Sequence, residues 1–255
     1  MCPLFGYTKI FIYSIDYFTC HKGGNKINLR KLILTQNACY KAGKTIKPKG
    51  IMIHSTGVNN PNLRRYVGPD DGYLGINPYN NHWNQDRPGG KSVCVHAFIG
   101  KLKDGSIASY QTLPWNHRGW HAGGDANNTH ISIELCEDDH KDAEYFKGVY
   151  KEAVELSAHL CKLYNLSSES IIGHYEGYQR GIASNHSDPR NWFTKHGKSM
   201  MNFRADVKKL LTQQPPEERK LYRVQIGAYA IKANAEAQLA RAKEAGFTDA
   251  FITYY

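Results

Sequence analysis

The sequence predicts an α/β protein, because β-prone runs and amphipathic helical patterns alternate along one chain of 255 residues. Residues 129–136 alternate between apolar and polar side chains, as in a strand with one buried face. Residues 142–164 carry apolar side chains at steps of three and four, as in a helix that packs on a sheet. With 41% hydrophobic and 22% charged residues, the chain can bury one full core and a small appendage.

The first half of the chain is expected to contribute strands and one long loop. We expect residues 1–26 to be a poorly ordered leader and the main domain to begin at residue 27. Residues 50–54 (Gly-Ile-Met-Ile-His) predict a short buried strand that ends at His54. Asn, Pro, Gly and Asp are abundant in residues 58–91, which predicts a long surface loop.

A hairpin and a loop rich in Trp, His and Gly follow. The runs 92–99 and 106–113 flank Lys-Asp-Gly at 103–105, which predicts two antiparallel strands. We expect the next segment, 115–124, either to line a substrate groove or to form a packed aromatic cluster. No catalytic role is assigned to Trp120 or His121 within it.

Helices dominate the second half of the main domain. The stripe of the 142–164 helix consists of Phe146, Val149, Ala153, Leu156, Leu160 and Leu163. A loop rich in Gly, Ser, Asn and Pro covers 173–193, and a closing helix is expected at 200–211. The main domain is thus predicted to span residues 27–212.

Residues 213–219 (Gln-Gln-Pro-Pro-Glu-Glu-Arg) have the composition of a linker, and residues 220–255 form a separate tail. The tail predicts a strand at 221–229, a helix at 233–245 and a strand at 250–254. A β-α-β unit of this size is too small to bury a convincing core by itself.

The charge and the cysteines limit the cellular setting. A formal net charge of +10 favours a polyanionic partner, such as nucleic acid, an anionic membrane or an anionic cell wall. The six cysteines form no Cys-x-x-Cys pair, so we expect them to be mostly reduced and buried. Because no segment predicts a membrane span and the N-terminus lacks the basic start of a signal peptide, we expect synthesis in the cytoplasm without membrane insertion.

Two histidines and an aspartate in the 173–193 loop suggest a metal site. A catalytic zinc ion needs three protein ligands and one open position for water. His174 and Asp188 supply two of them, and His54 supplies a third because a rigid strand can aim it at this loop. The alternative is that these are ordinary hydrogen-bonded histidines, as an arbitrary histidine usually is.

Glu134 is the candidate for moving protons. It lies on the face of the 129–136 strand opposite the Ile and Leu side chains. A carboxylate near the metal could accept a proton from water that zinc has acidified. The alternative is an ordinary exposed residue of the strand.

Four separated motifs carry a family resemblance. They are Gly-Ile-Met-Ile-His-Ser-Thr at 50–56, Trp-His-Ala-Gly at 120–123, Asn-Thr-His-Ile-Ser-Ile-Glu-Leu at 128–135, and Gly-His at 173–174 with His-Ser-Asp-Pro at 186–189. In this order they resemble the zinc-dependent N-acetylmuramoyl-L-alanine amidases of type 2, which are related to peptidoglycan recognition proteins and phage lysozyme-amidases. The likeness spans residues 45–210 and implies a mixed central β-sheet with helices packed around it and zinc in a groove.

The same resemblance implies a role for each site residue. His54, His174 and Asp188 match the zinc ligands, and Glu134 matches the acidic residue that handles the proton of the water. His186 is a departure, because many members carry lysine there to stabilise the oxyanion. An imidazole N–H of His186 could do this work, or the ring could compete with Asp188 for the metal. We favour Asp188 as the ligand because the proline after it fixes the turn.

The tail resembles the first half of a sporulation-related repeat (SPOR) domain, a family that binds peptidoglycan glycan strands. Tyr-Arg-Val-Gln-Ile-Gly-Ala-Tyr at 222–229 and Ala-Gly-Phe at 245–247 carry this likeness. Only one β-α-β unit is present where the family has two. A short capping element is the alternative.

Together these features predict a peptidoglycan hydrolase that cleaves the amide between N-acetylmuramic acid and L-alanine. A wall-binding tail without an export signal favours a phage or prophage endolysin, while a bacterial autolysin would share the chemistry. A non-catalytic peptidoglycan-binding protein is disfavoured because all three ligand positions hold competent residues. Nucleic-acid binding has no reading motif to support it, and the oligomeric state stays open.

Overall fold

The computed structural model describes residues 27–139, 141–213 and 225–253. The chain divides into two compact units, Met1–Pro216 and Glu217–Tyr255. The predicted leader at 1–26 and most of the predicted linker at 213–219 lie outside the described residues.

The first unit is built from six strands and five α-helices in the part that the structure describes. The strands are β1 Leu29–Lys31, β2 Gly50–Ser55, β3 Ala97–Lys101, β4 Ile107–Gln111, β5 His130–Leu135 and β6 Ile171–Gly173. The helices are α1 Ala38–Lys41, α2 Ala143–Tyr164, α3 His174–Gln179, α4 Arg190–Lys195 and α5 Met200–Thr212.

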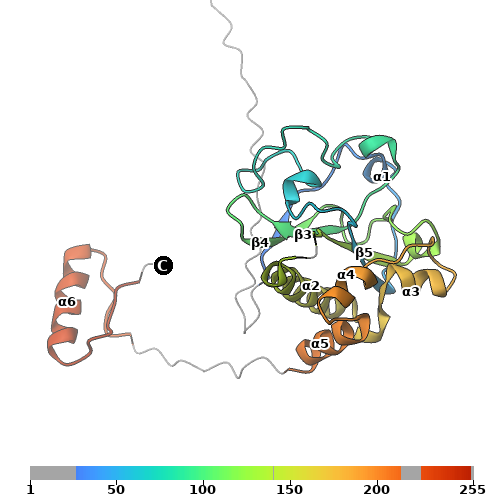
Figure 1. Cartoon of the computed structure of the whole chain (residues 1–255). Coiled ribbons are helices and arrows are strands. Elements are labelled where there is room, and N and C mark those ends of the chain that lie inside the picture. Colours follow the sequence, from blue (N-terminus) through green and yellow to red (C-terminus); the bar gives the residue numbers. More distant parts are fainter. Residues whose placement is uncertain (1–26, 140, 214–224, 254–255) are drawn as a thin grey trace, which may run out of the picture. The chain divides into compact units, whose positions relative to one another are not determined.

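The six strands form one mixed sheet in the order β1-β4-β3-β5-β2-β6. Only β3 and β4 run antiparallel; the pairs β1–β4, β3–β5, β5–β2 and β2–β6 are parallel. Helices pack around this sheet (Figure 1). The predicted fold class, a mixed central sheet with surrounding helices, is therefore confirmed.

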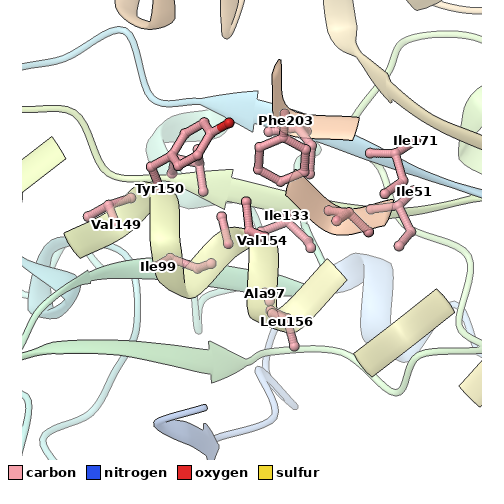
Figure 2. Packing of buried hydrophobic residues seen from close by; sticks show 14 of the residues in the cluster. Ile51, Ala97, Ile99, Ile133, Val149, Tyr150, Val154, Leu156, Ile171 and Phe203 are labelled. Atoms are coloured by element: carbon pink, nitrogen blue, oxygen red, sulfur yellow. The ribbon is translucent and has the colours of Figure 1, made fainter. Parts of the chain in front are cut away.

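The main core lies between the sheet and the long helix α2. Strand residues Ile51, Ile99 and Ile133 meet Val149 and other apolar side chains of α2 in a cluster that also takes in α4 and α5. Figure 2 shows this contact, with Phe203 of α5 at its edge. Each buried aliphatic side chain of this kind contributes about 1.5–3 kcal/mol through its removal from water.

Helix α2 has defined ends. The Asp142 side chain accepts a hydrogen bond from the Tyr145 backbone N–H, and Asn165 adopts a left-handed conformation that stops the helix. The predicted helix at 142–164 is confirmed, but Leu163 of its predicted buried stripe is 55% exposed.

A second cluster covers the opposite face of the sheet. It joins Phe98 and Tyr110 of the strands to Leu63, Tyr66 and Leu74 from the predicted 58–91 loop. The four cysteines that the structure describes are free and buried, as expected from the sequence. Every helix in the described residues is too short or too polar to cross a lipid bilayer.

The second unit departs from its prediction. Its helix, α6 Lys232–Glu244, matches the predicted 233–245 helix, but residues 225–229 and 250–253 form no strand. The predicted β-α-β unit is therefore wrong for the described residues. Two strands with no further strand beside them are marginal in water, so a strand pattern alone did not suffice here.

Candidate metal centre

Three parallel strands bring the predicted site residues to one edge of the sheet. In the register of β2 and β5, His54 lies directly beside Glu134. Between β2 and β6, Ile53 lies beside Gly173, so His54 is next to His174, the residue that follows β6. The carboxyl ends of parallel strands share one edge of the sheet. His54, Glu134 and His174 therefore lie in one row, although 80 positions separate His54 from Glu134 and 40 separate Glu134 from His174.

Side-chain alternation decides the face on which His54 lies. Ile51 and Ile53 point into the core under α2, whereas Met52 packs on the opposite face with Ala122 and Ile172. His54 shares the face of Met52, since successive side chains of a strand alternate. It therefore lies away from α2, and only 3% of its surface is exposed.

His174 opens helix α3 and Asp188 returns to it from the following loop. The Glu176 side chain accepts a hydrogen bond from the Gly173 backbone N–H at 2.9 Å, which fixes the start of α3. The Tyr175 backbone N–H donates to the Asp188 carbonyl at 3.2 Å, which holds the loop against the helix. The segment predicted as a loop at 173–193 thus contains α3 and α4, and the site residues lie beside these helices.

The three proposed ligands converge. His54 Nδ1 lies 3.0 Å from His174 Nδ1 and 3.1 Å from Asp188 Oδ2, and His174 Nδ1 lies 3.5 Å from Asp188 Oδ1. Among the described residues, these three make up the one group of at least three His, Cys, Asp or Glu side chains close enough to share a metal ion.

The spacing and the donors fit zinc. Four ligands at about 2.0–2.1 Å from a tetrahedral zinc ion lie about 3.4 Å from one another. The separations of 3.0 to 3.5 Å among these three donors are close to that value. Two neutral imidazoles and one carboxylate leave the fourth position for water or substrate, as in catalytic sites.

Burial sets the charge states around this group. Burial lowers the pKa of His54, which favours the neutral imidazole that binds a metal. Burial opposes ionisation of Asp188, but hydrogen bonds to His174 and His54 prevail and hold its pKa well below the usual range. Burial raises the pKa of Glu134 well above the usual range, and the charges of Asp188 and Glu137 act in the same direction.

His186 lies at the rim of the group. Its ring stacks on that of His174 with centroids 4.7 Å apart, and its Nδ1 is 3.8 Å from Asp188 Oδ1. The His186 side chain is 62% exposed, whereas that of Asp188 is 16% exposed. A cavity of about 550 Å³ opens beside both, lined by Ser55, Thr56, Gly57, Glu137, Asn185, His186, Ser187, Asp188 and Asn191.

The 115–124 segment contacts the proposed site through a histidine and not through its tryptophans. Trp115 and Trp120 pack against hydrophobic clusters and do not line the cavity, so the packed-cluster alternative holds for them. His121, to which no role was assigned, lies with Nδ1 3.0 Å from Nε2 of His54. The Trp-His-Ala-Gly motif was the only sequence signal near this contact.

Comparison with protein families gives two matches. The profile described as N-acetylmuramoyl-L-alanine amidase matches residues 44–191, and the profile of the SPOR domain matches residues 200–254. The SPOR match begins within α5, which packs on α2 in the first unit.

A curated relative shares part of the sequence. A probable N-acetylmuramoyl-L-alanine amidase of Bacillus licheniformis is 34% identical over 86 residues, which is 34% of this chain. The match spans 22% of the length of that relative.

Solved structures share the fold at lower identity. The Staphylococcus aureus hydrolase AmiA in complex with its ligand superposes with a TM-score of 0.53 at 17% identity, over 73% of this chain and 83% of AmiA. The structure of PlyL superposes with a TM-score of 0.51 at 21% identity, over 72% of this chain and 98% of PlyL. At these identities the likeness extends to the fold alone.

Proposed function

Because the chain belongs to the N-acetylmuramoyl-L-alanine amidase family, whose profile matches residues 44–191, we propose that it hydrolyses the amide between N-acetylmuramic acid and L-alanine in peptidoglycan. The observation that carries this proposal is the convergence of His54, His174 and Asp188 beside Glu134. The adjoining cavity gives a polymer-bound substrate access to that row.

Zinc is the metal that this donor set favours. His54 and His174 would hold it through Nδ1, and Asp188 through its carboxylate. Zinc bound there would supply Lewis acidity, which lowers the pKa of coordinated water to near 7 and polarises the scissile carbonyl.

Glu134 serves as the general base and then as the general acid. Its carboxylate accepts a proton from the attacking water and returns it to the nitrogen of the departing L-alanine. An acid–base group works best when its pKa lies near the working pH, and burial moves the pKa of Glu134 in that direction.

His186 stabilises the oxyanion. Its exposed ring lines the cavity next to Asp188, where an imidazole N–H can donate to the carbonyl oxygen as negative charge develops. This donor replaces the lysine that the family resemblance implies at the same position.

The second unit binds peptidoglycan by this proposal. The SPOR profile matches residues 200–254, which supports this role. We assign the chain the role of a phage or prophage endolysin that is made in the cytoplasm and acts on the wall after its release. A bacterial autolysin would use the same residues.

Digestion of purified peptidoglycan tests the reaction. The expected product is a new N-terminal L-alanine, released by the wild-type chain and reduced at least about 10²-fold by Glu134→Gln, since general catalysis contributes about 10²–10⁴-fold. New reducing sugar ends, or a different new amino terminus, would refute the proposed bond. Chelation of the metal is expected to stop turnover, and added zinc to restore it.

A further inference from the structure

A hydrogen bond behind the metal site connects His54 to a second histidine. His54 turns Nδ1 toward His174 and Asp188, and its other ring nitrogen, Nε2, lies 3.0 Å from Nδ1 of His121. The two rings are nearly perpendicular, with 83° between their planes. His121 thus contacts the one nitrogen of His54 that faces away from the other ligands.

The protonation of this pair follows from the metal chemistry, so the argument rests on the proposed zinc site. A neutral imidazole that gives the Nδ1 lone pair to a metal carries its proton on Nε2. That N–H of His54 donates to His121 Nδ1, which must therefore be unprotonated. The ring proton of His121 then sits on its own Nε2.

His121 Nε2 is buried and has no hydrogen-bond partner among the described residues. A buried N–H without a partner is unfavourable, and a phenylalanine would fill the same space without that cost. Within the described part of the chain, the contact with His54 is the hydrogen bond of the imidazole that offsets this cost.

The backbone at His121 is held in place by Asn127. The Asn127 side-chain oxygen accepts from the backbone N–H groups of His121 and Ala122, each at 2.8 Å. A Cβ atom on Gly119 would lie 2.9 Å from Cδ2 of His121, so the ring also fits closely against this glycine. The acceptor nitrogen of His121 is therefore fixed before any metal binds.

The other histidine ligand has a parallel arrangement on the same segment. Ser184 Oγ donates to the Ala122 carbonyl at 3.1 Å and lies 3.3 Å from His174 Nε2. With its proton engaged by Ala122, the hydroxyl is left to accept from His174. Residues 121 and 122 thus support both ligand histidines from behind.

We propose that His121 is a positioning residue of the metal centre: it accepts the Nε2 proton of His54, fixes the ring and its tautomer, and thereby presents Nδ1 to the metal. Outer partners of this kind orient the ligand and raise its basicity.

Zinc affinity of the full-length chain, measured by competition with a chromogenic chelator, tests this role. His121→Phe keeps the ring volume and removes the acceptor, so the affinity is expected to fall about 10–100-fold. His121→Asn puts an amide oxygen close to the position of Nδ1 and is expected to restore the affinity to within a few-fold. His130→Phe is the control and is expected to keep the wild-type zinc affinity. It makes the same replacement on β5, the strand beside β2, where the His130 ring hydrogen-bonds to Thr129.

Circular dichroism and the unfolding midpoint of the zinc-free proteins check that each variant folds. Wild-type zinc affinity in a folded His121→Phe variant, or a His121→Asn variant as weak as His121→Phe, would overturn the positioning role alone. If His174→Ala binds zinc like the wild type, the metal site itself is wrong and the role of His121 fails with it.

Discussion

At the scale of single residues, Asp188 and His186 differ in their contacts with His54 and His174, the two histidines proposed as ligands. The Asp188 carboxylate reaches Nδ1 of both His54 and His174 and is mostly buried, whereas the His186 ring is stacked on His174 and is largely exposed. Burial and contact with both rings favour a ligand, and exposure at the cavity favours contact with the substrate.

Replacing Asp188 and His186 by alanine, each in a separate variant, tests their roles. Asp188→Ala is expected to lose stoichiometric zinc, because two neutral imidazoles remain where three ligands were. His186→Ala is expected to keep zinc and to lower kcat by about 10²-fold or more, the usual cost of one oxyanion donor. Zinc content by mass spectrometry and turnover of peptidoglycan measure the two effects. Zinc lost from His186→Ala and kept in Asp188→Ala would reverse the assignment.

A buried carboxylate on α2 gives the first unit a dependence on pH. Glu152 accepts hydrogen bonds from the Ser109 hydroxyl and the Asn28 backbone N–H, and burial raises its pKa to about 7. The folded state therefore binds the proton more tightly than the unfolded chain. This contribution to stability is full below the unfolded pKa of about 4.5 and is lost as the pH rises through 7.

Glu152→Gln is expected to remove that dependence. The variant should nearly match the wild type at pH 4.5 and exceed its free energy of unfolding by roughly 3–4 kcal/mol at pH 8, from about 1.36 kcal/mol per pKa unit. Urea unfolding at the two pH values measures the difference. Glu144→Gln on the same helix is the control, because its side chain is 84% exposed. Equal pH dependence in both variants would show that Glu152 does not titrate near 7.

Sequence motifs name the residues of the proposed site but not the contact between His54 and His121. His54, Glu134, His174 and Asp188 each stand in a recognisable motif, and three of the four lie at or just beyond strand ends. His121 also stands in a motif, but its contact with His54 joins residues 67 positions apart. Such a contact depends on how a loop folds back over the sheet, which no local pattern encodes.

At the scale of secondary-structure elements, a charged pair connects the site helix to the end of the first unit. Arg204 of α5 donates to both carboxylate oxygens of Glu176 on α3, at 2.8 and 3.0 Å, and to the Ile171 carbonyl at 3.1 Å. Glu176 in turn accepts the Gly173 N–H at the start of α3. A bidentate, partly buried pair of this kind is stronger than an exposed one.

Arg204→Ala is expected to lower the free energy of unfolding by about 1–3 kcal/mol, because it leaves the Glu176 carboxylate partly buried without its partner. Denaturant unfolding of the zinc-free protein measures this loss. Lys209→Ala is the matched control on the same helix: its side chain is 71% exposed and pairs with Asp206, so a change below about 0.5 kcal/mol is expected. Equal losses in the two variants would mean that α3 does not depend on this pair.

Elements with a strong period were predicted well and those that depend on partners were not. The helix at 142–164 and the strands at 50–54 and 129–136 match α2, β2 and β5 to within one residue at each end. The strand predicted at 92–99 begins only at Ala97, because Cys94 forms an isolated bridge with Trp120. The short helices α3 and α4 were not predicted, because the Gly, Ser and Asn residues of this segment favour turns and indicated a loop.

At the scale of the whole molecule, apolar burial is concentrated in the first unit. All four hydrophobic clusters of the described chain draw their members from residues 29–211. In the second unit, Ala242 is the one buried hydrophobic side chain among the described residues. The first unit therefore has the core that independent folding needs.

The charge is also unevenly divided. The chain carries 33 Lys and Arg against 23 Asp and Glu, but residues 217–255 carry six against five. Nearly the whole positive excess lies in the first unit. Long-range attraction to an anionic wall is thus expected to come from the first unit, and any contribution of the second unit must come from short-range contacts.

Truncation after Pro216 separates these two contributions. We expect the shortened chain to hydrolyse a soluble muramyl peptide with kcat/KM within about twofold of the full chain, since the proposed site and its core are intact. Binding to insoluble peptidoglycan is expected to weaken, most clearly at 1 M salt, where a Debye length of about 3 Å removes the electrostatic attraction. Sedimentation with peptidoglycan at low and high salt measures binding. Equal binding of both chains at high salt would exclude a wall-binding tail, and loss of activity on the soluble substrate would show that the first unit needs the second.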